Sequence, residues 1–221
     1  MCAVSSRSQC VGRAVSFARW AAIRRDMLCI PKANHKKLVD DCYPTSKALV
    51  NAAPEYRPNA NELGRLVYYA QCKPAKLSKV GRLLMTRASS ESRAFMAANT
   101  EKNKALVMIT LGVLRDLVSS CQEGHAYLAP AVRSMLTDAV NVAAPTGSAM
   151  TSWDMDICAR ASSIFAMYVQ SIPAGEVDTD DAVSSAVFQG LSDLQRLGKG
   201  RASVQSRMIW IAGINGLIRS P

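Results

Sequence analysis

Basic side chains at two places in the chain are the residues best suited to bind a charged partner. They are Lys32, Lys36 and Lys37 in the first segment, and Lys73, Lys76, Lys79 and Arg82 in the second. The second set is spaced three residues apart, so on a helix these side chains keep roughly to one side. Near an anionic lipid surface each such cation contributes about 1 kcal/mol, and five or six together give roughly 5 kcal/mol. The pattern predicts reversible, salt-sensitive binding to a polyanion.

Cysteines are the other side chains that could react or bind a metal, and the chain has seven of them. Their number is odd and no two are spaced as CxxC, which argues against a disulfide framework or a zinc site and indicates a reducing compartment. Cys121 and Cys158 lie in apolar helical patterns, where a buried reduced thiol is expected. Cys29 lies beside the first basic set, so its S-acylation would add a second membrane signal, with Cys2 and Cys10 as alternatives.

Signatures of catalysis and of cofactor binding are missing from the sequence. His35 and His125 have no partner at metal-ligand spacing, and we expect both at the surface. Neither a GxSxG elbow nor an HExxH motif occurs, and the loop Gly198-Lys199-Gly200 lacks the other residues of a phosphate-binding loop. We therefore expect a non-enzymatic protein without a cofactor or a bound metal.

The excess of positive charge is confined to the first part of the chain. Residues 1–87 hold 16 Lys/Arg against 5 Asp/Glu, whereas residues 88–221 hold 11 against 12. This asymmetry favours a polyanionic partner, which is either membrane phospholipid or RNA. The only adjacent aromatic residues in the basic part, Tyr68 and Tyr69, would point in different directions and form no stacking platform. RNA binding is therefore the alternative, and we expect no DNA partner.

Residues 1–28 differ in composition from the rest of the chain. They are rich in Arg and Ser and hold no acidic residue before Asp26, which is typical of a mitochondrial transit peptide. However, the apolar and basic side chains do not separate on a helical wheel. We predict a disordered or targeting-like extension, with true initiation at Met27 and a mitochondrial location as alternatives. The longest apolar run, Ala105 to Leu114, is ten residues and too short to span a bilayer.

Apolar residues at helical spacing predict helices through most of the remaining chain. We expect helices over 34–41, from 61 to Pro74, from 75 into the nineties, and over 101–121 and 126–143. Two more should run from Thr151 to Pro173 and from a cap at Asp178 or Thr179 to Gly198, before an apolar segment over 204–218. The helix over 101–121 is apolar on two faces and belongs in the middle of a stack. Arg87, like Lys76 and Lys79, should face outward.

The predicted fold is all-α, an armadillo- or HEAT-like helical-repeat solenoid, with an irregular helical bundle as the alternative. Residues 29–60 form a basic, membrane-facing segment in this interpretation, and residues 61–221 form the helical-repeat domain. The apolar segment over 204–218 has no polar outer face, which predicts a solenoid truncated at its C-terminus.

Spaced blocks in residues 31–87 carry a family resemblance. The blocks are Pro31-Lys32, His35-Lys36-Lys37-Leu38-Val39, Cys42-Tyr43-Pro44-Thr45, Asn61-Glu62-Leu63, Leu66, Tyr68-Tyr69, Lys76-Leu77-Ser78-Lys79-Val80-Gly81, Leu84 and Arg87. In this order they resemble the N-terminal signature of the fungal eighty-five-requiring protein three, the rolling blackout family. Two features depart from it: Ala33-Asn34 interrupts the usual Pro-Lys-His run, and family members are several times longer.

The resemblance implies an armadillo/HEAT-like rod on the cytoplasmic face of the plasma membrane. Such a rod anchors a phosphatidylinositol 4-kinase complex there through a tetratricopeptide-repeat adaptor. Its basic surface, which meets acidic phospholipids, would here consist of the seven cations named above. By the same resemblance, a lipidated cysteine would be Cys29. The region that contacts the kinase complex would be missing from this chain, so recruitment of the kinase is an open expectation.

Overall fold

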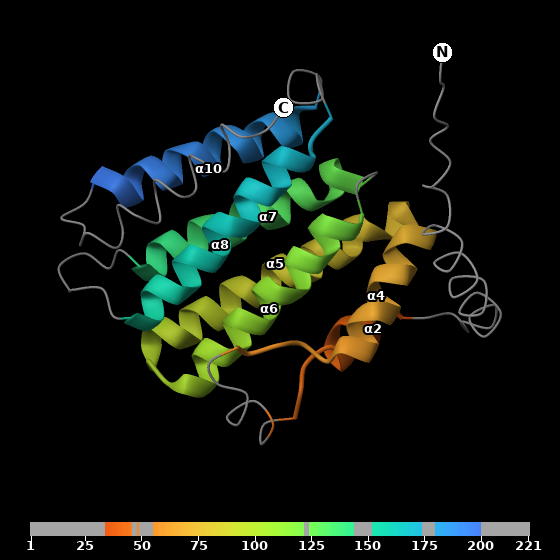
Figure 1. Cartoon of the computed structure of the whole chain (residues 1–221), viewed down its shortest axis with the longest axis horizontal. Coiled ribbons are helices and arrows are strands. Elements are labelled where there is room, and N and C mark those ends of the chain that lie inside the picture. Colours follow the sequence, from red (N-terminus) through yellow and green to blue (C-terminus); the bar gives the residue numbers. More distant parts are fainter. Residues whose placement is uncertain are drawn as a thin grey trace, which may run out of the picture. The chain divides into compact units, whose positions relative to one another are not determined.

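The computed structural model describes residues 34–45, 48, 55–121, 124–143, 152–173 and 180–199 (Figure 1). In these ranges the elements are all α-helices and no strand occurs, so the all-α prediction is confirmed. The helices belong to a compact unit that begins at His35. The predicted extension over 1–28 and the apolar segment over 204–218 lie outside the described residues, and the predicted domain boundaries stay predictions.

The helices follow the predicted order, with bounds that differ by a few residues. They are α2 (His35–Asp41), α4 (Ala60–Cys72), α5 (Pro74–Ala97), α6 (Glu101–Ser120), α7 (His125–Ala143), α8 (Ser152–Ser171) and α10 (Asp181–Lys199). Pro74 is the first residue of α5, where its missing N–H costs no hydrogen bond. α6 is capped by Thr100, whose side chain accepts a hydrogen bond from the Asn103 backbone N–H at 3.3 Å.

The start of α10 differs from its prediction. The side chain of Asp180 accepts hydrogen bonds from the backbone N–H groups of Ala182 at 2.8 Å and Val183 at 3.1 Å. Asp180 is therefore the cap, and the prediction of a cap at Asp178 or Thr179 is wrong. The carboxylate nearest the first helical residue is the one that reaches the unsatisfied N–H groups of the first turn.

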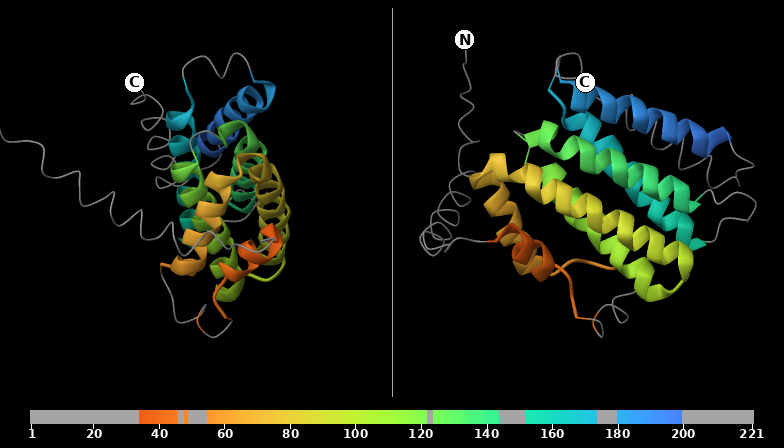
Figure 2. Two further views of the ribbon diagram at one scale, coloured as in Figure 1. Left: turned by 90° about the vertical axis from the view of Figure 1, so that its right-hand side faces the viewer. Right: turned by 180° about the vertical axis from the view of Figure 1, so that it is seen from behind.

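The helices stack in two layers, which Figures 1 and 2 show from different directions. α5, α7 and α10 pack side by side in one layer, and α6 packs on α8 in the other. The chain alternates between layers, because α5 is followed by α6 and α7 by α8. α4 packs on α5 and α6, and α2 packs on α4 and α5. Stacked helical hairpins of this kind agree with the predicted helical solenoid.

α6 is enclosed on most sides by described helices, as its two apolar faces predict. It packs against α4, α5 and α8, with a smaller contact to α7. The apolar residues of both predicted faces are buried, except Leu106, which is half-buried. The buried members are Val107, Ile109, Leu111, Val113, Leu114, Leu117 and Val118. A helix that is apolar around most of its circumference is stable only in such a central position.

Polar contacts between side chains join neighbouring helices within each layer. Each contact involves one aspartate carboxylate: Ser89 Oγ to Asp138 Oδ2 at 2.6 Å (α5 to α7), Thr137 Oγ1 to Asp193 Oδ2 at 2.6 Å (α7 to α10), and Lys104 Nζ to Asp156 Oδ2 at 2.5 Å (α6 to α8). Hydrogen bonds to a charged acceptor are stronger and more directional than apolar contacts. These pairs, here called the aspartate rungs, therefore help to fix the register of adjacent helices.

Candidate functional site

Six of the seven predicted cations lie on described residues, and all six are exposed. They are Lys36 and Lys37 on α2, Lys73 between α4 and α5, and Lys76, Lys79 and Arg82 on α5. These six residues are called the cationic set below. The seventh predicted cation, Lys32, and the predicted lipidation residue, Cys29, lie outside the described residues.

The burial of α5 explains why its cations face solvent. Leu77, Val80 and Leu84 are at most 1% exposed and form the buried stripe of the helix. Lys79 and Arg82 lie on the opposite side of a helix with this stripe, and both are exposed. The expectation that the whole cationic set shares one face of the folded chain stays a prediction.

The electrostatic surroundings of the cationic set differ from those of Arg65 and Arg115. Within the part of the chain that the structure describes, no ion pair neutralises Lys37, Lys76, Lys79 or Arg82. Lys73 Nζ lies 5.4 Å from the centre of the Tyr69 ring, and this cation–π contact does not neutralise the charge of the lysine. By contrast, Arg65 is paired with Glu62 at 2.9 Å, and Arg115 with Asp116 at 2.9 Å. The set therefore presents charge that an external anion can neutralise.

Arg87 does not belong to this outward-facing set, and its prediction as an outward residue is wrong. Its Nη1 donates to Asp40 Oδ1 of α2 at 2.6 Å, and its Nε donates to Glu91 Oε1 at 3.1 Å. The guanidinium carbon lies 3.6 Å from the centre of the Tyr43 ring. Arg87 thus ties α2, which carries Lys36 and Lys37, to α5. The two ion pairs and the stacked ring together are called the Arg87 clamp below.

The Arg87 clamp continues inward as a chain of hydrogen bonds. Thr110 Oγ1 on α6 lies 2.5 Å from both Glu91 Oε2 and the Tyr43 hydroxyl. Burial raises the pKa of Glu91, against the lowering effects of the Thr110 hydrogen bond and of Arg87. Burial also raises the pKa of the Tyr43 hydroxyl, which therefore stays neutral. Tyr43, Glu91 and Thr110, which have lost most of their contact with water, thus join α5 and α6 to the segment that follows α2.

The described residues provide no candidate metal centre. No group of three or more His, Cys, Asp or Glu side chains among them is arranged to hold a metal ion. His125 is 3% exposed, so its prediction as a surface residue is wrong. Its ring meets Tyr168 edge-on with centres 6.0 Å apart, and the Tyr168 hydroxyl donates to the His125 backbone carbonyl at 3.3 Å. Cys121 and Cys158 are buried free thiols, as predicted.

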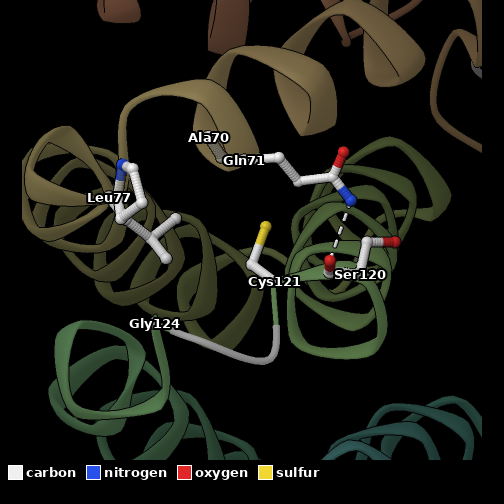
Figure 3. Close-up of a pocket in the computed structure, with 7 residues that line it drawn as sticks. Ala70, Gln71, Leu77, Ser120, Cys121 and Gly124 are labelled. Carbon is white, nitrogen blue, oxygen red and sulfur yellow. Dashed lines mark hydrogen bonds between the residues drawn. The ribbon is translucent and has the colours of Figure 1, made fainter.

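A pocket lies where four helices end or begin, next to Lys73. α4 and α6 end there, and α5 and α7 begin there, around a cavity of about 370 Å³ (Figure 3). Ala70, Pro74, Leu77 and Cys121 line it together with Gly124. The sequence does not predict this pocket, because its walls come from four separate segments that show no pattern along the chain.

No helix in the described ranges combines the length and the apolar character that crossing a bilayer requires. The structure does not test the predicted acylation of Cys29, since that residue lies outside the described part.

Comparison with known proteins gives a family match and several similar fungal proteins. Residues 34–139 match the family model described as EFR3 protein. Protein EFR3 of Mycosarcoma maydis is 46% identical over 171 residues, which cover 76% of this chain and 16% of that protein. Protein EFR3 of Cryptococcus neoformans is 30% identical over 190 residues, covering 81% of this chain and 18% of the relative. No solved structure matches the chain.

The relatives are much longer than this chain, which spans less than a fifth of these two. A third relative, Protein EFR3 of Yarrowia lipolytica, is 29% identical over 194 residues, covering 86% of this chain and 20% of that protein. The family model covers α2, α4, α5 and α6 and most of α7, and thus the whole described cationic set and the Arg87 clamp. The chain therefore belongs to the EFR3 family, the eighty-five-requiring protein three family that its spaced N-terminal blocks resemble.

Proposed function

We propose that this chain is a non-enzymatic scaffold that binds acidic phospholipids at the cytoplasmic face of the plasma membrane. The cationic set, together with Lys32, forms the lipid-binding surface in this proposal. The scaffold helps to recruit a phosphatidylinositol 4-kinase complex through a tetratricopeptide-repeat adaptor. The kinase part of the proposal rests on the family resemblance alone, since the chain spans less than a fifth of the EFR3 proteins from M. maydis and C. neoformans.

The observation that carries the proposal is the exposure of the whole described cationic set. Six basic side chains, four of them without an ion pair to any described residue, lie on the first helices of the compact unit. At about 1 kcal/mol for each cation near an anionic leaflet, such a set supports reversible binding. The Arg87 clamp holds α2 on α5, which supports the proposal that the cations of these two helices act on the same membrane surface.

Vesicle flotation of the full chain tests the lipid-binding part of the proposal. We expect flotation with vesicles that contain phosphatidylserine or a phosphoinositide, and none with neutral phosphatidylcholine vesicles. High salt should release the protein, because exposed charges are screened within about 10 Å at 0.1 M salt. Flotation that is equal on neutral and anionic vesicles would contradict binding through the cationic set.

Charge reversal at part of the cationic set should abolish the flotation. The test variant carries Lys37→Glu, Lys76→Glu and Lys79→Glu, all at exposed positions. A control with the same change in net charge reverses three exposed basic residues outside the set: Lys102→Glu, Arg115→Glu and Arg133→Glu. If both variants lose flotation equally, net charge rather than the cationic set is responsible.

RNA binding is the second candidate, because the same cations would neutralise phosphates of a nucleic acid. Of the two adjacent aromatic residues, Tyr69 is only 4% exposed and Tyr68 is half-buried, so this pair offers no open stacking platform. Competition by RNA in the flotation assay separates the two functions. Displacement of the protein from anionic vesicles by low concentrations of RNA would favour the second candidate.

A further inference from the structure

The short helix α2 depends on its neighbours for its position. It has seven residues, whereas an isolated helix in water is marginal even at about 12–15 residues. Leu38 and Val39 are its buried residues, and α4 and α5 are the helices on which it mainly packs. The place that Lys36 and Lys37 take in the folded chain is therefore set by the contacts that attach α2 to these helices.

One of these contacts is made by Asp40, one helical turn from both lysines. Asp40 follows Lys36 by four residues and Lys37 by three, and residues at these spacings are neighbours on a helix. Its Oδ1 accepts a hydrogen bond from Arg87 Nη1 of α5 at 2.6 Å. The Tyr43 ring lies 3.6 Å from the same guanidinium carbon and holds the chain just after α2. The ion pair also neutralises a carboxylate that would otherwise oppose the charge of the lysines.

The side of α5 from which Arg87 projects also carries a lysine of the cationic set. Lys76 precedes Arg87 by eleven residues, which returns to within about 20° of the same direction after three helical turns. Lys79 precedes Arg87 by eight residues and lies about 80° away around the helix. Both lysines are exposed. Arg87 thus attaches α2 on the side of α5 that Lys76 shares and that Lys79 borders.

We propose that the Arg87 clamp is a positioning device for lipid binding, which holds the two lysines of α2 beside those of α5 so that they bind anionic headgroups as one surface. This inference rests on the proposed lipid-binding function and adds to it the residues that arrange the site. Cations held in one arrangement bind together without the cost of ordering them on the membrane. Asp40, Tyr43 and Arg87 act through the lysines and are positioning residues.

Two adjacent aspartates of α2 provide a matched test in the full chain. Asp40→Ala and Asp41→Ala each remove one negative charge, which by itself strengthens binding to an anionic surface. Asp40 is paired with Arg87, whereas Asp41 forms no ion pair with the described residues. Flotation over a range of lipid concentrations, with vesicles of phosphatidylcholine and phosphatidylserine, measures the affinity. We expect Asp40→Ala to weaken binding about tenfold, and Asp41→Ala to leave it unchanged or strengthen it.

A double-mutant cycle distinguishes positioning from a purely structural role of Asp40. In the wild-type chain, Lys36→Ala with Lys37→Ala should weaken binding about thirtyfold, since each cation near an anionic leaflet contributes about fivefold. In the Asp40→Ala chain, the same two substitutions should weaken binding by no more than about threefold, because the lysines are no longer held at the surface. If Asp40 only stabilised the fold, the effect would be about thirtyfold in both chains.

A second variant keeps the net charge constant. Arg87→Lys preserves the positive charge but not the planar guanidinium that reaches Asp40 and Glu91 together. We expect it to weaken vesicle binding about threefold. Circular dichroism and thermal unfolding show whether each variant is folded, and Arg87→Lys takes the place of Asp40→Ala in the cycle if that variant does not fold.

The possible results separate this inference from the proposed function. Binding by Asp40→Ala as tight as that of Asp41→Ala, or a thirtyfold effect of the lysine substitutions in both chains, would overturn the positioning role and leave the lipid-binding surface intact. If the wild-type chain floats on no anionic vesicle, both proposals are overturned. Weakened binding by Asp40→Ala, with little further loss when the two lysines are removed, supports the positioning role.

Discussion

Arg87 joins two regions that lie far apart in the sequence, the end of α2 with the residues after it and the middle of α5. Asp40 comes from α2, Glu91 from the next turn of α5, and Tyr43 from the chain that follows α2. Burial alone would lower the pKa of Arg87, but Tyr43, Asp40 and Glu91 together raise it, so the guanidinium stays charged. The clamp therefore stabilises a buried carboxylate and attaches a short helix at the same time.

We expect Arg87→Ala to lower the free energy of unfolding by about 2 kcal/mol, because Glu91 would remain in a buried site without its cation. Urea unfolding at neutral pH measures the change. Arg82→Ala is the matched control on the same helix, since Arg82 is exposed and should change the stability by less than about 0.5 kcal/mol. Equal effects of the two substitutions would contradict the structural role of the clamp.

Periodicity along α5 could not distinguish Arg87 from its exposed neighbours. The helical pattern separates an apolar stripe from a polar face, but Arg87 lies at the edge of that face, where α2 packs. Its ion pair with Asp40 spans 47 residues and leaves no trace in a local pattern. Glu91, four residues after Arg87, was the one local signal, because acid–base pairs at this spacing are helix neighbours.

The surface position predicted for His125 was wrong for a similar reason, since its ring packs against Tyr168 of α8, a residue far away in the sequence.

The packing of α10 on α8 depends on a glycine, Gly190, at the contact between the two helices. A β-carbon on Gly190 of α10 would lie 2.2 Å from Cε2 of Phe165, whose side chain is fully buried on α8. The ring has no room to move, because protein cores are densely packed. Gly190 is thus required by the packing of α10 on α8.

Gly190→Ala should therefore destabilise the protein by about 2 kcal/mol, although alanine favours a helix. Gly64→Ala on α4 is the control, because a β-carbon there would have nothing within 4 Å. It should stabilise the protein by up to about 1 kcal/mol. Thermal unfolding of both variants measures this difference in sign, and stabilisation by both would show that α10 does not pack on α8 in this way.

The helices themselves were predictable because strong local signals mark their ends. Pro74 separates α4 from α5, and Gly124 precedes α7. The stacking of the hairpins was predictable in outline from the apolar faces of α6. The aspartate rungs and the pocket were not, because each depends on segments that only the folded chain brings together.

At the scale of the whole described unit, stability should decrease from the centre of the stack to its edges. α6 packs on helices of both layers, whereas α2 has seven residues and packs only on α4 and α5. Amide hydrogen exchange of the full chain should therefore be slowest in α6 and fastest in α2 among these helices. Exchange at equal rates in α2 and α6 would indicate that the unit opens only as a whole.

The cationic set lies on α2, on α5 and between α4 and α5, so the proposed membrane contact involves one part of the stack. The described helices α8 and α10 contribute no residue to it.

The Arg87 clamp also has a mechanical consequence. A force applied to α2 would pass through Asp40 to Arg87, and thus into α5. A second route leads from Tyr43 through the Thr110 hydroxyl into α6. Tension at this short helix would therefore be shared with two long helices of the stack, α5 and α6.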